Sequence, residues 1–276
     1  MKKYSYMYFM WSLVFIVFPL ILILVYAFNS SSGMSLENYG ITLDNFRRVF
    51  EPLYIKIFFV SILLAIASTV LCIIIGYPVA YFISRMKDKW RNSLMLLFVV
   101  PMWMNFLLRT YAWLTLLGNN GLINKFLGLF GIAPLNLMYN MSAIMLGMVY
   151  NFLPFMVLPI YSTLVKMDKS LIEAARDLGA TNSQIFKKVI LPLSLPGVYT
   201  GITMVFIPAI STFVIPDLLG GNRFYLIGNL IEKQFTFTGD WAFGSAISIV
   251  LIAIMFILLL LQNLFEKKEA TGGAKW

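Results

Sequence analysis

The sequence predicts an all-α, polytopic membrane protein with six transmembrane helices. Hydrophobic residues make up 60% of the chain and charged residues only 12%, whereas a soluble domain carries about 25% charged residues. The mean hydropathy is +0.84, and the apolar runs reach the roughly 20 residues that a helix needs to cross a bilayer. We expect a single transmembrane domain over residues 1–276, with spans at about 7–28, 57–84, 93–117, 141–165, 193–216 and 241–265.

Long runs without charge support each span. The first run, Tyr4–Leu36, is too long for a cleaved signal peptide, and no small-x-small cleavage site follows it cleanly, so we expect a retained span. The third run, Asn92–Asn124, contains one basic residue, Arg109. Proline and glycine inside the spans are compatible with bilayer helices, because neighbouring groups satisfy the freed backbone. The other charge-free runs are Ile57–Ser84, Phe126–Val165, Val189–Pro216 and Trp241–Phe265.

Basic residues are distributed unequally between the two sides of the expected topology. Fourteen Lys and Arg residues fall on the side of the two termini, and seven fall on the other side. Positive charge accumulates on the cytoplasmic side of membrane proteins. We therefore expect a multi-pass protein with both termini in the cytoplasm, and we attribute most of the net charge of +9 to topology rather than to a nucleic-acid surface.

A charged, helix-forming segment at 170–192 separates two of the expected spans. Ser170 and Glu173 have the spacing of a capping box, and Thr181 and Gln184 repeat it. Gly179 between them is a plausible helix stop that needs a left-handed backbone or close packing. We expect two short helices, the second running to Leu191 before Pro192, which form an elbow on the cytoplasmic side. An apolar stripe on the first helix consists of Leu171, Ile172, Ala175 and Leu178.

The chain lacks the residue sets of most enzymes. It contains no histidine, and its one cysteine, Cys72, lies within an expected span. No G-x-x-x-x-G-K-[ST] phosphate loop is present. We expect no enzymatic activity and no metal site in this chain, so any ATP hydrolysis that drives it belongs to another polypeptide.

The elbow carries a family resemblance. Glu173-Ala174-Ala175, three residues, Gly179, nine residues and then Val189-Ile190-Leu191-Pro192 resemble the EAA signature of ABC-importer permeases, with Val189 in place of the usual isoleucine. Further stretches resemble the spermidine/putrescine (PotB-type) permeases of that family. These stretches are LDNFRRVFEPLYIK, GYPVAYFISR, PMWMNFLLRTYAW with GNNGLINKFL, VYNFLPFMVLPIYSTLVKMDKSLIEAARDLGA, and DLLGGNRFYLIGNLI followed by DWAFGSAIS.

The resemblance implies a type I ABC importer permease fold with a cytoplasmic EAA coupling helix. It further implies a polyamine importer in a bacterial plasma (inner) membrane, whose partners are an ABC ATPase dimer, a second homologous permease and an extracytoplasmic polyamine-binding protein. The chain would bind no cofactor, and the ATPase would use ATP and Mg. Glu173 would serve as a helix cap, as a partner contact, or as both. The coupling residues implied are Leu171, Ile172, Glu173, Ala174, Ala175, Leu178, Gly179, Leu191 and Pro192.

All twelve acidic residues lie outside the expected apolar cores. A polycation could pass a path of aromatic faces and neutral oxygens, using cation–π contacts of roughly 0.5–2 kcal/mol each. Candidates are Trp103, Asn105, Tyr111 and Trp113, whose aromatic members are alternatively an interfacial belt. Asp217, at the outer end of the fifth span, is a candidate for the mouth of the path or an exposed loop residue. Arg109 could snorkel to the interface or pair with an acid.

Two alternatives remain open from the sequence. One is the same architecture importing another small solute, such as an anion or a metal complex. The other is a stand-alone channel or membrane scaffold, which has no need of a docking elbow. The choice between putrescine and spermidine is also open, because the binding protein is expected to set it.

Overall fold

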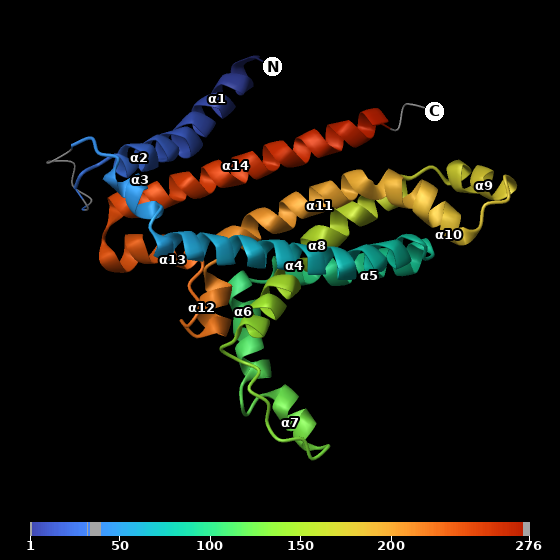
Figure 1. Ribbon diagram of the computed structural model, residues 1–276. Coiled ribbons are helices and arrows are strands. Elements are labelled where there is room, and N and C mark those ends of the chain that lie inside the picture. The colour runs from blue at the N-terminus through green and yellow to red at the C-terminus, as the bar shows by residue number, and fades with distance from the viewer. Residues whose placement is uncertain (1, 32, 34–39, 273–276) are drawn as a thin grey trace. The chain divides into compact units, whose positions relative to one another are not determined.

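The computed structural model describes residues 2–31, 33 and 40–272, and these residues are mostly helical (Figure 1). The helices are α1 (Lys2–Ser12), α2 (Phe18–Ala27), α3 (Asp44–Val49), α4 (Pro52–Ser84), α5 (Asp88–Trp103), α6 (Phe106–Leu117), α7 (Leu122–Gly128), α8 (Met141–Lys166), α9 (Lys169–Asp177), α10 (Asn182–Ile185), α11 (Leu191–Ser211), α12 (Val214–Gly220), α13 (Ile227–Lys233) and α14 (Trp241–Gly272). Three π-helical turns join or extend them, at Leu13–Val17, Phe186–Ile190 and Gln234–Thr238.

Four of the six expected spans correspond to single long apolar helices in the structure. Met7–Ala27, Met141–Lys166 and Trp241–Leu264 match their predicted bounds within a few residues. Pro52–Ser84 begins about one turn earlier than predicted. Pro52 opens this helix, where its missing N–H has no intrahelical partner to lose.

The third expected span, 93–117, is not a continuous helix. It is broken between α5 and α6, and the helical segments on the two sides of the break meet at 97°. Met104 has an extended backbone, and the Asn105 side chain accepts a hydrogen bond from the backbone N–H of Leu107 at 2.8 Å. This N-cap starts a new helix in a run that hydropathy alone reads as uninterrupted.

The fifth expected span, 193–216, begins earlier and ends earlier than predicted. Its helix belongs to an apolar segment that starts at Asn182 and ends at Ser211. Thr212 is extended, and α12 starts at Val214. Pro216 falls in the first turn of α12, where proline removes no intrahelical hydrogen bond, so it belongs to the new helix rather than to the span.

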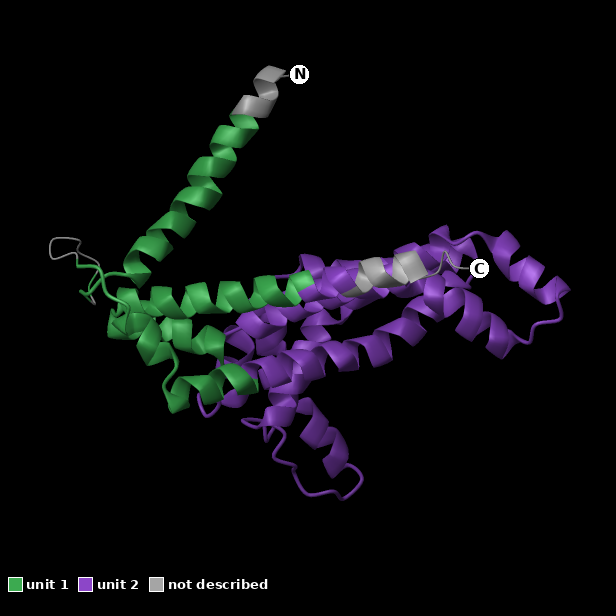
Figure 2. Cartoon of the chain, turned by 45° about the horizontal axis from the view of Figure 1, so that its top comes forward, with its two compact units in different colours: residues 1–60, 226–260 green, residues 61–225, 261–276 purple. Residues whose placement is uncertain are grey.

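The chain forms two compact units, residues 1–60 with 226–260 and residues 61–225 with 261–276 (Figure 2). In the first unit, Arg48 joins α3 to the start of α14. Its Nη1 lies 3.0 Å from a carboxylate oxygen of Asp240, and its guanidinium stands 4.0 Å from the ring centre of Phe243.

The core of the second unit lies between α8 and α11. Gly197 and Gly201, four residues apart on α11, allow close approach to α8. A Cβ at Gly197 would lie 2.8 Å from the Pro159 carbonyl oxygen, and one at Gly201 would lie 2.6 Å from the Met156 sulfur. Fully buried side chains of both helices, Met148, Met156, Ile160, Val205 and Ile210 among them, fill the contact.

Candidate functional site

The elbow begins one residue after Met167 with an aspartate cap. The Asp168 carboxylate accepts the backbone N–H of Ser170 at 2.9 Å, and α9 starts at Lys169. The predicted capping box of Ser170 and Glu173 is therefore wrong, because the helix already includes both residues. Two hydrogen bonds from Ser170 lower the pKa of the Asp168 carboxyl, and the bond from the backbone N–H has a larger effect than the bond from the side chain.

The bend of the elbow is a Schellman turn centred on Gly179. Gly179 has φ +78° and donates its N–H to the Arg176 carbonyl at 2.8 Å. The Ala180 N–H donates to the Ala175 carbonyl at 3.0 Å, which completes the motif. Nothing lies within 4 Å of a Cβ built on Gly179, so the left-handed backbone, rather than close packing, is what favours glycine here.

The second helix of the elbow starts as predicted but ends differently. Thr181 and Gln184 form the expected capping box, with the Thr181 N–H donating to Gln184 Oε1 at 2.8 Å. The helix does not stop before Pro192. It passes through the π-helical turn Phe186–Ile190 directly into α11, and Pro192 is the second residue of α11, just after that turn. The elbow and the fifth span are thus one continuous helical segment.

The inner face of the elbow packs against its own chain. Ile172 of α9 joins Ile185 and Ile190 in a small buried cluster, which Tyr81 of α4 and Leu164 of α8 complete. The Tyr81 ring meets the Phe186 ring edge to face, with centroids 5.3 Å apart. The elbow is therefore fixed to α4 and α8 as well as to α11, so a force on it reaches three helices.

The outer face of α9 carries apolar side chains that this chain leaves exposed. Leu171, Ala174 and Leu178, which we call the outer stripe, recur on one side of the helix at spacings of three and seven residues. Leu171 is 46% exposed and Leu178 is 88% exposed. The sequence predicted one stripe of Leu171, Ile172, Ala175 and Leu178. The structure divides that set, because Ile172 and Ala175 pack inward while both leucines face outward.

The remaining elbow residues differ in exposure. Glu173 and Gly179 are exposed, Leu191 is partly buried, and Pro192 is exposed on the first turn of α11. Glu173 is not the cap of its helix, since Asp168 fills that role. Of the two roles considered for Glu173, the contact with a partner is the one left to test.

The predicted path residues of the third span do not converge on one site. Trp103 ends α5 and is 81% exposed, and Asn105 caps α6. Tyr111 is 50% exposed, whereas Trp113 packs edge to face on Tyr150 of α8, with centroids 5.2 Å apart. Tyr111 and Trp113 are two residues apart on a helix and so point in nearly opposite directions.

Asp217 is a helical residue rather than part of an exposed loop. It lies in α12, partly buried, and α12 packs against α6 and α8. Arg109 of α6 is 8% exposed, its Nε has no hydrogen-bond partner among the described residues, and its guanidinium stands 5.9 Å from the Phe106 ring centre. Snorkelling does not describe Arg109, because its side chain is enclosed by protein.

Sequence reasoning missed three residues that build the elbow. Asp168 caps α9, and Phe186 makes the ring contact with Tyr81. Just beyond the elbow, the Ser194 Oγ forms a hydrogen bond of 2.8 Å with the Tyr77 hydroxyl. An aspartate directly before a helical run is a recognisable N-cap signal. The other two contacts join α4 to residues more than a hundred positions later, which no local pattern indicates.

Residues 72–270 match the model of the family described as binding-protein-dependent transport system inner membrane component. The chain is 40% identical over 264 residues to the spermidine/putrescine transport system permease protein PotB of Salmonella typhimurium, covering 94% of this chain and 92% of that protein. It is also 40% identical to PotB of Escherichia coli K12, over 94% of this chain and 96% of that one.

A solved structure has the same fold. It is a bacterial alginate ABC transporter in complex with a periplasmic protein that binds an alginate pentasaccharide. The TM-score is 0.81 at 16% identity, covering 97% of this chain and 93% of the matched chain. At this identity the likeness concerns the fold alone. It places the chain in the architecture of ABC importer permeases.

Proposed function

Since the chain belongs to the family of inner membrane components of binding-protein-dependent transport systems, we propose that it is the permease subunit of an ATP-driven polyamine importer. The 40% identity to spermidine/putrescine permeases along nearly the whole chain supports the choice of substrate. The outer stripe supports coupling to an ATPase. Leu178 is 88% exposed at the end of a short polar helix, and a docked partner would cover such a side chain.

The coupling step uses both faces of the elbow. An ATPase subunit buries Leu171, Ala174 and Leu178 of the outer stripe, and its motion displaces α9. The cluster around Ile172 holds α9 to α4, α8 and the continuous helix of α10 and α11, so the displacement reaches the spans. Glu173 is exposed on the same helix, where a basic group of the partner can pair with it.

The other partners follow from this assignment. A second, homologous permease completes the path, and an extracytoplasmic polyamine-binding protein delivers the solute. ATP and Mg bind to the partner ATPase, while this chain binds no cofactor and hydrolyses nothing. The fold neighbour in complex with its periplasmic protein supports the general arrangement.

The proposed orientation places the elbow and both termini in the cytoplasm. A cysteine at Asn182, which is exposed on the elbow, reacts with an impermeant thiol reagent only after permeabilisation, and one at Asn120 reacts in intact cells. Native Cys72 is fully buried and gives little background. Labelling of Asn182→Cys in intact cells would overturn both the orientation and ATPase docking.

Asp217 is proposed to attract the ammonium groups of the substrate at the extracytoplasmic end of the path. Asp217→Asn should raise the external concentration for half-maximal uptake, and more for spermidine than for putrescine, because spermidine carries the additional charge. Unchanged uptake of both across all concentrations would restrict Asp217 to a structural role on α12. The partly buried Glu232 serves as a matched control, as Glu232→Gln removes one acid elsewhere.

The direct test is uptake by a strain from which the gene is deleted and then restored. Restored cells should accumulate labelled spermidine or putrescine but not a labelled amino acid. The second candidate is an anionic solute, which Arg109 would favour only if its guanidinium faces the path. Accumulation of an anion, with no polyamine uptake above that of the deletion strain, would replace the proposed substrate while leaving the importer assignment intact.

A further inference from the structure

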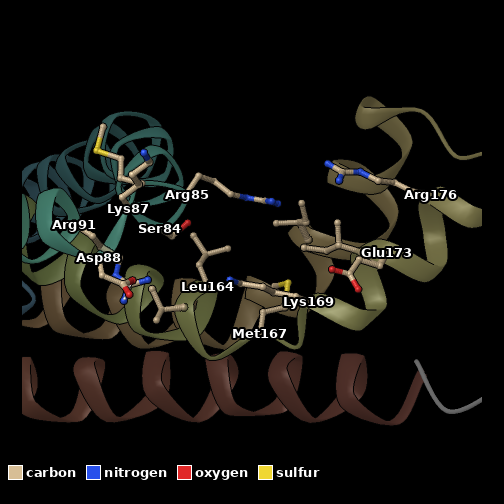
Figure 3. A pocket seen from close by; sticks show the side chains of 14 residues that line it. Ser84, Arg85, Lys87, Asp88, Arg91, Leu164, Met167, Lys169, Glu173 and Arg176 are labelled. Atoms are coloured by element: carbon tan, nitrogen blue, oxygen red, sulfur yellow. Dashed lines mark ion pairs between the residues drawn. The ribbon is translucent and has the colours of Figure 1, made fainter.

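A basic cavity lies on the inner side of the elbow, with a volume of about 550 Å³ (Figure 3). Its walls come from the end of α4, the start of α5, the end of α8 and the inner part of α9, all in one compact unit. Five basic and two acidic side chains line it, together with apolar ones. The charged residues are Arg85, Lys87, Arg91, Lys169, Arg176, Asp88 and Glu173.

The acids do not balance the bases. Asp88 forms an ion pair with Arg91, with a carboxylate oxygen 2.6 Å from the Arg91 Nη2. The Arg91 Nε is nevertheless buried without a hydrogen-bond partner among the described residues. The side chains of Arg85 and Arg176 extend toward each other from opposite walls, and neither has an ion pair with an acid in the described part of the chain (Figure 3). Like charges facing one another across a cavity favour an anion between them.

The cavity lies at the level where the apolar spans end. The charge-free run of α4 stops at Ser84 and that of α8 stops at Val165, and both residues line the cavity. The apolar part of α5 begins just after Arg91. This depth is that of lipid headgroups, where a cavity can hold a phosphate at its basic wall and the glycerol and upper acyl carbons against Leu164, Val165 and Ile172.

We propose that this cavity binds the phosphate-bearing headgroup of an anionic phospholipid from the leaflet on the elbow side. The phosphate bridges Arg85 on the α4–α5 connection and Arg176 on α9, and so ties the inner face of the elbow to the spans. The position of α9 then depends on the anionic lipid content of the membrane. Neither the substrate nor the ATPase takes part in this binding.

The test uses the purified full chain, extracted in mild detergent from vesicles of phosphatidylcholine with and without phosphatidylglycerol. Native mass spectrometry counts the phosphatidylglycerol retained per chain. Arg85→Gln with Arg176→Gln should weaken retention by about fivefold for each basic side chain removed. The matched control is Lys187→Gln with Lys188→Gln, which removes two exposed charges from the same elbow outside the cavity and should leave retention unchanged.

Two further arms make the result decisive. Arg85→Lys with Arg176→Lys should keep most of the retention, which separates loss of charge from loss of folding. Excess inorganic phosphate should not displace the lipid, and displacement would assign the cavity to a free phosphate instead. The proposal would be overturned if the Arg85→Gln, Arg176→Gln variant retained as much phosphatidylglycerol as the Lys187→Gln, Lys188→Gln control and the unmodified chain. An effect of the glutamine variant on ATPase binding alone would also overturn it, and would assign the cavity to an acidic segment of that partner.

Discussion

The Tyr77 hydroxyl lies 2.8 Å from the Ser194 Oγ and joins α4 to α11 immediately beyond the elbow. Ser194 has one hydroxyl proton, which it donates to the Leu191 carbonyl at 2.8 Å. Tyr77 must therefore donate to Ser194. Both side chains are buried, Tyr77 at 9% exposure and Ser194 at 0%, so the acceptor has no water to replace Tyr77.

Tyr77→Phe should lower the free energy of unfolding by about 1 kcal/mol, because it removes the donor and keeps the ring. Thermal unfolding of the purified chain in detergent measures the change. Tyr81→Phe is the matched control, since Tyr81 lies on the same helix and keeps its ring contact with Phe186, while the hydrogen bond to Ser194 comes from Tyr77. Equal loss of stability in the two variants would show that the Tyr77–Ser194 bond contributes nothing.

Leu178→Asp should abolish transport and leave the stability of the isolated chain nearly unchanged. Leu178 is 88% exposed, so a charge there disturbs little of the packing among the described residues and opposes chiefly the docked partner. The measurements are uptake, ATPase retention on purification and thermal unfolding. Ile172→Ala provides the contrast, because it removes the centre of the inner cluster and should cost about 2 kcal/mol or more of stability. Normal uptake by Leu178→Asp would refute docking through the outer stripe.

Gly179 should tolerate asparagine far better than valine. A left-handed backbone costs an ordinary residue roughly 1–2 kcal/mol, and asparagine adopts it more readily than a β-branched residue does. The space around Gly179 is open, so side-chain size alone should not matter. Uptake and thermal stability of Gly179→Val and Gly179→Asn test this difference. Equal behaviour of the two variants would mean that the φ of +78° is not required for coupling.

Gly197→Ala should destabilise the chain more than Gly201→Ala. A methyl group at Gly197 meets Thr163 Oγ1 and the backbone oxygen of Pro159, which cannot move without shifting α8, whereas the shortest contact of one at Gly201 is with the side-chain sulfur of Met156. Overpacking of this kind costs about 1–3 kcal/mol. Gly128→Ala on α7 is the control, because nothing lies within 4 Å of its added carbon. The reverse order in thermal unfolding would contradict the described contact of α8 with α11.

Much of the fold could be predicted because the bilayer imposes length and hydropathy on each span. Four spans, the Thr181 cap and the conformation of Gly179 all follow from signals within about one turn of helix. The break at Asn105 could not be predicted, because a single capping side chain interrupts the helix while the average hydropathy of the run does not change. The end of the fifth span could not be predicted for a similar reason, since the helix ends at Thr212, which is an uncharged residue.

The candidate site could be located from the sequence but not resolved into faces. The apolar stripe of α9 was visible at helical spacing. Which of its members turn inward depends on Tyr81 and Leu164, which come from other helices and complete the cluster around Ile172. The basic cavity could not be predicted for the same reason, because Arg85 and Arg176 line one cavity only when the α4–α5 connection packs beside α9.

The central proposal for this protein is ATP-driven movement of a polyamine through the chain. The measurement that tests it most directly is accumulation of labelled spermidine by proteoliposomes that contain the chain, its partner permease and its ATPase, with the binding protein and ATP each supplied on its own side. We predict accumulation that requires both ATP and the binding protein and that Leu178→Asp abolishes. Spermidine entry at the same rate without ATP, or with this chain alone, would contradict the account and indicate a channel.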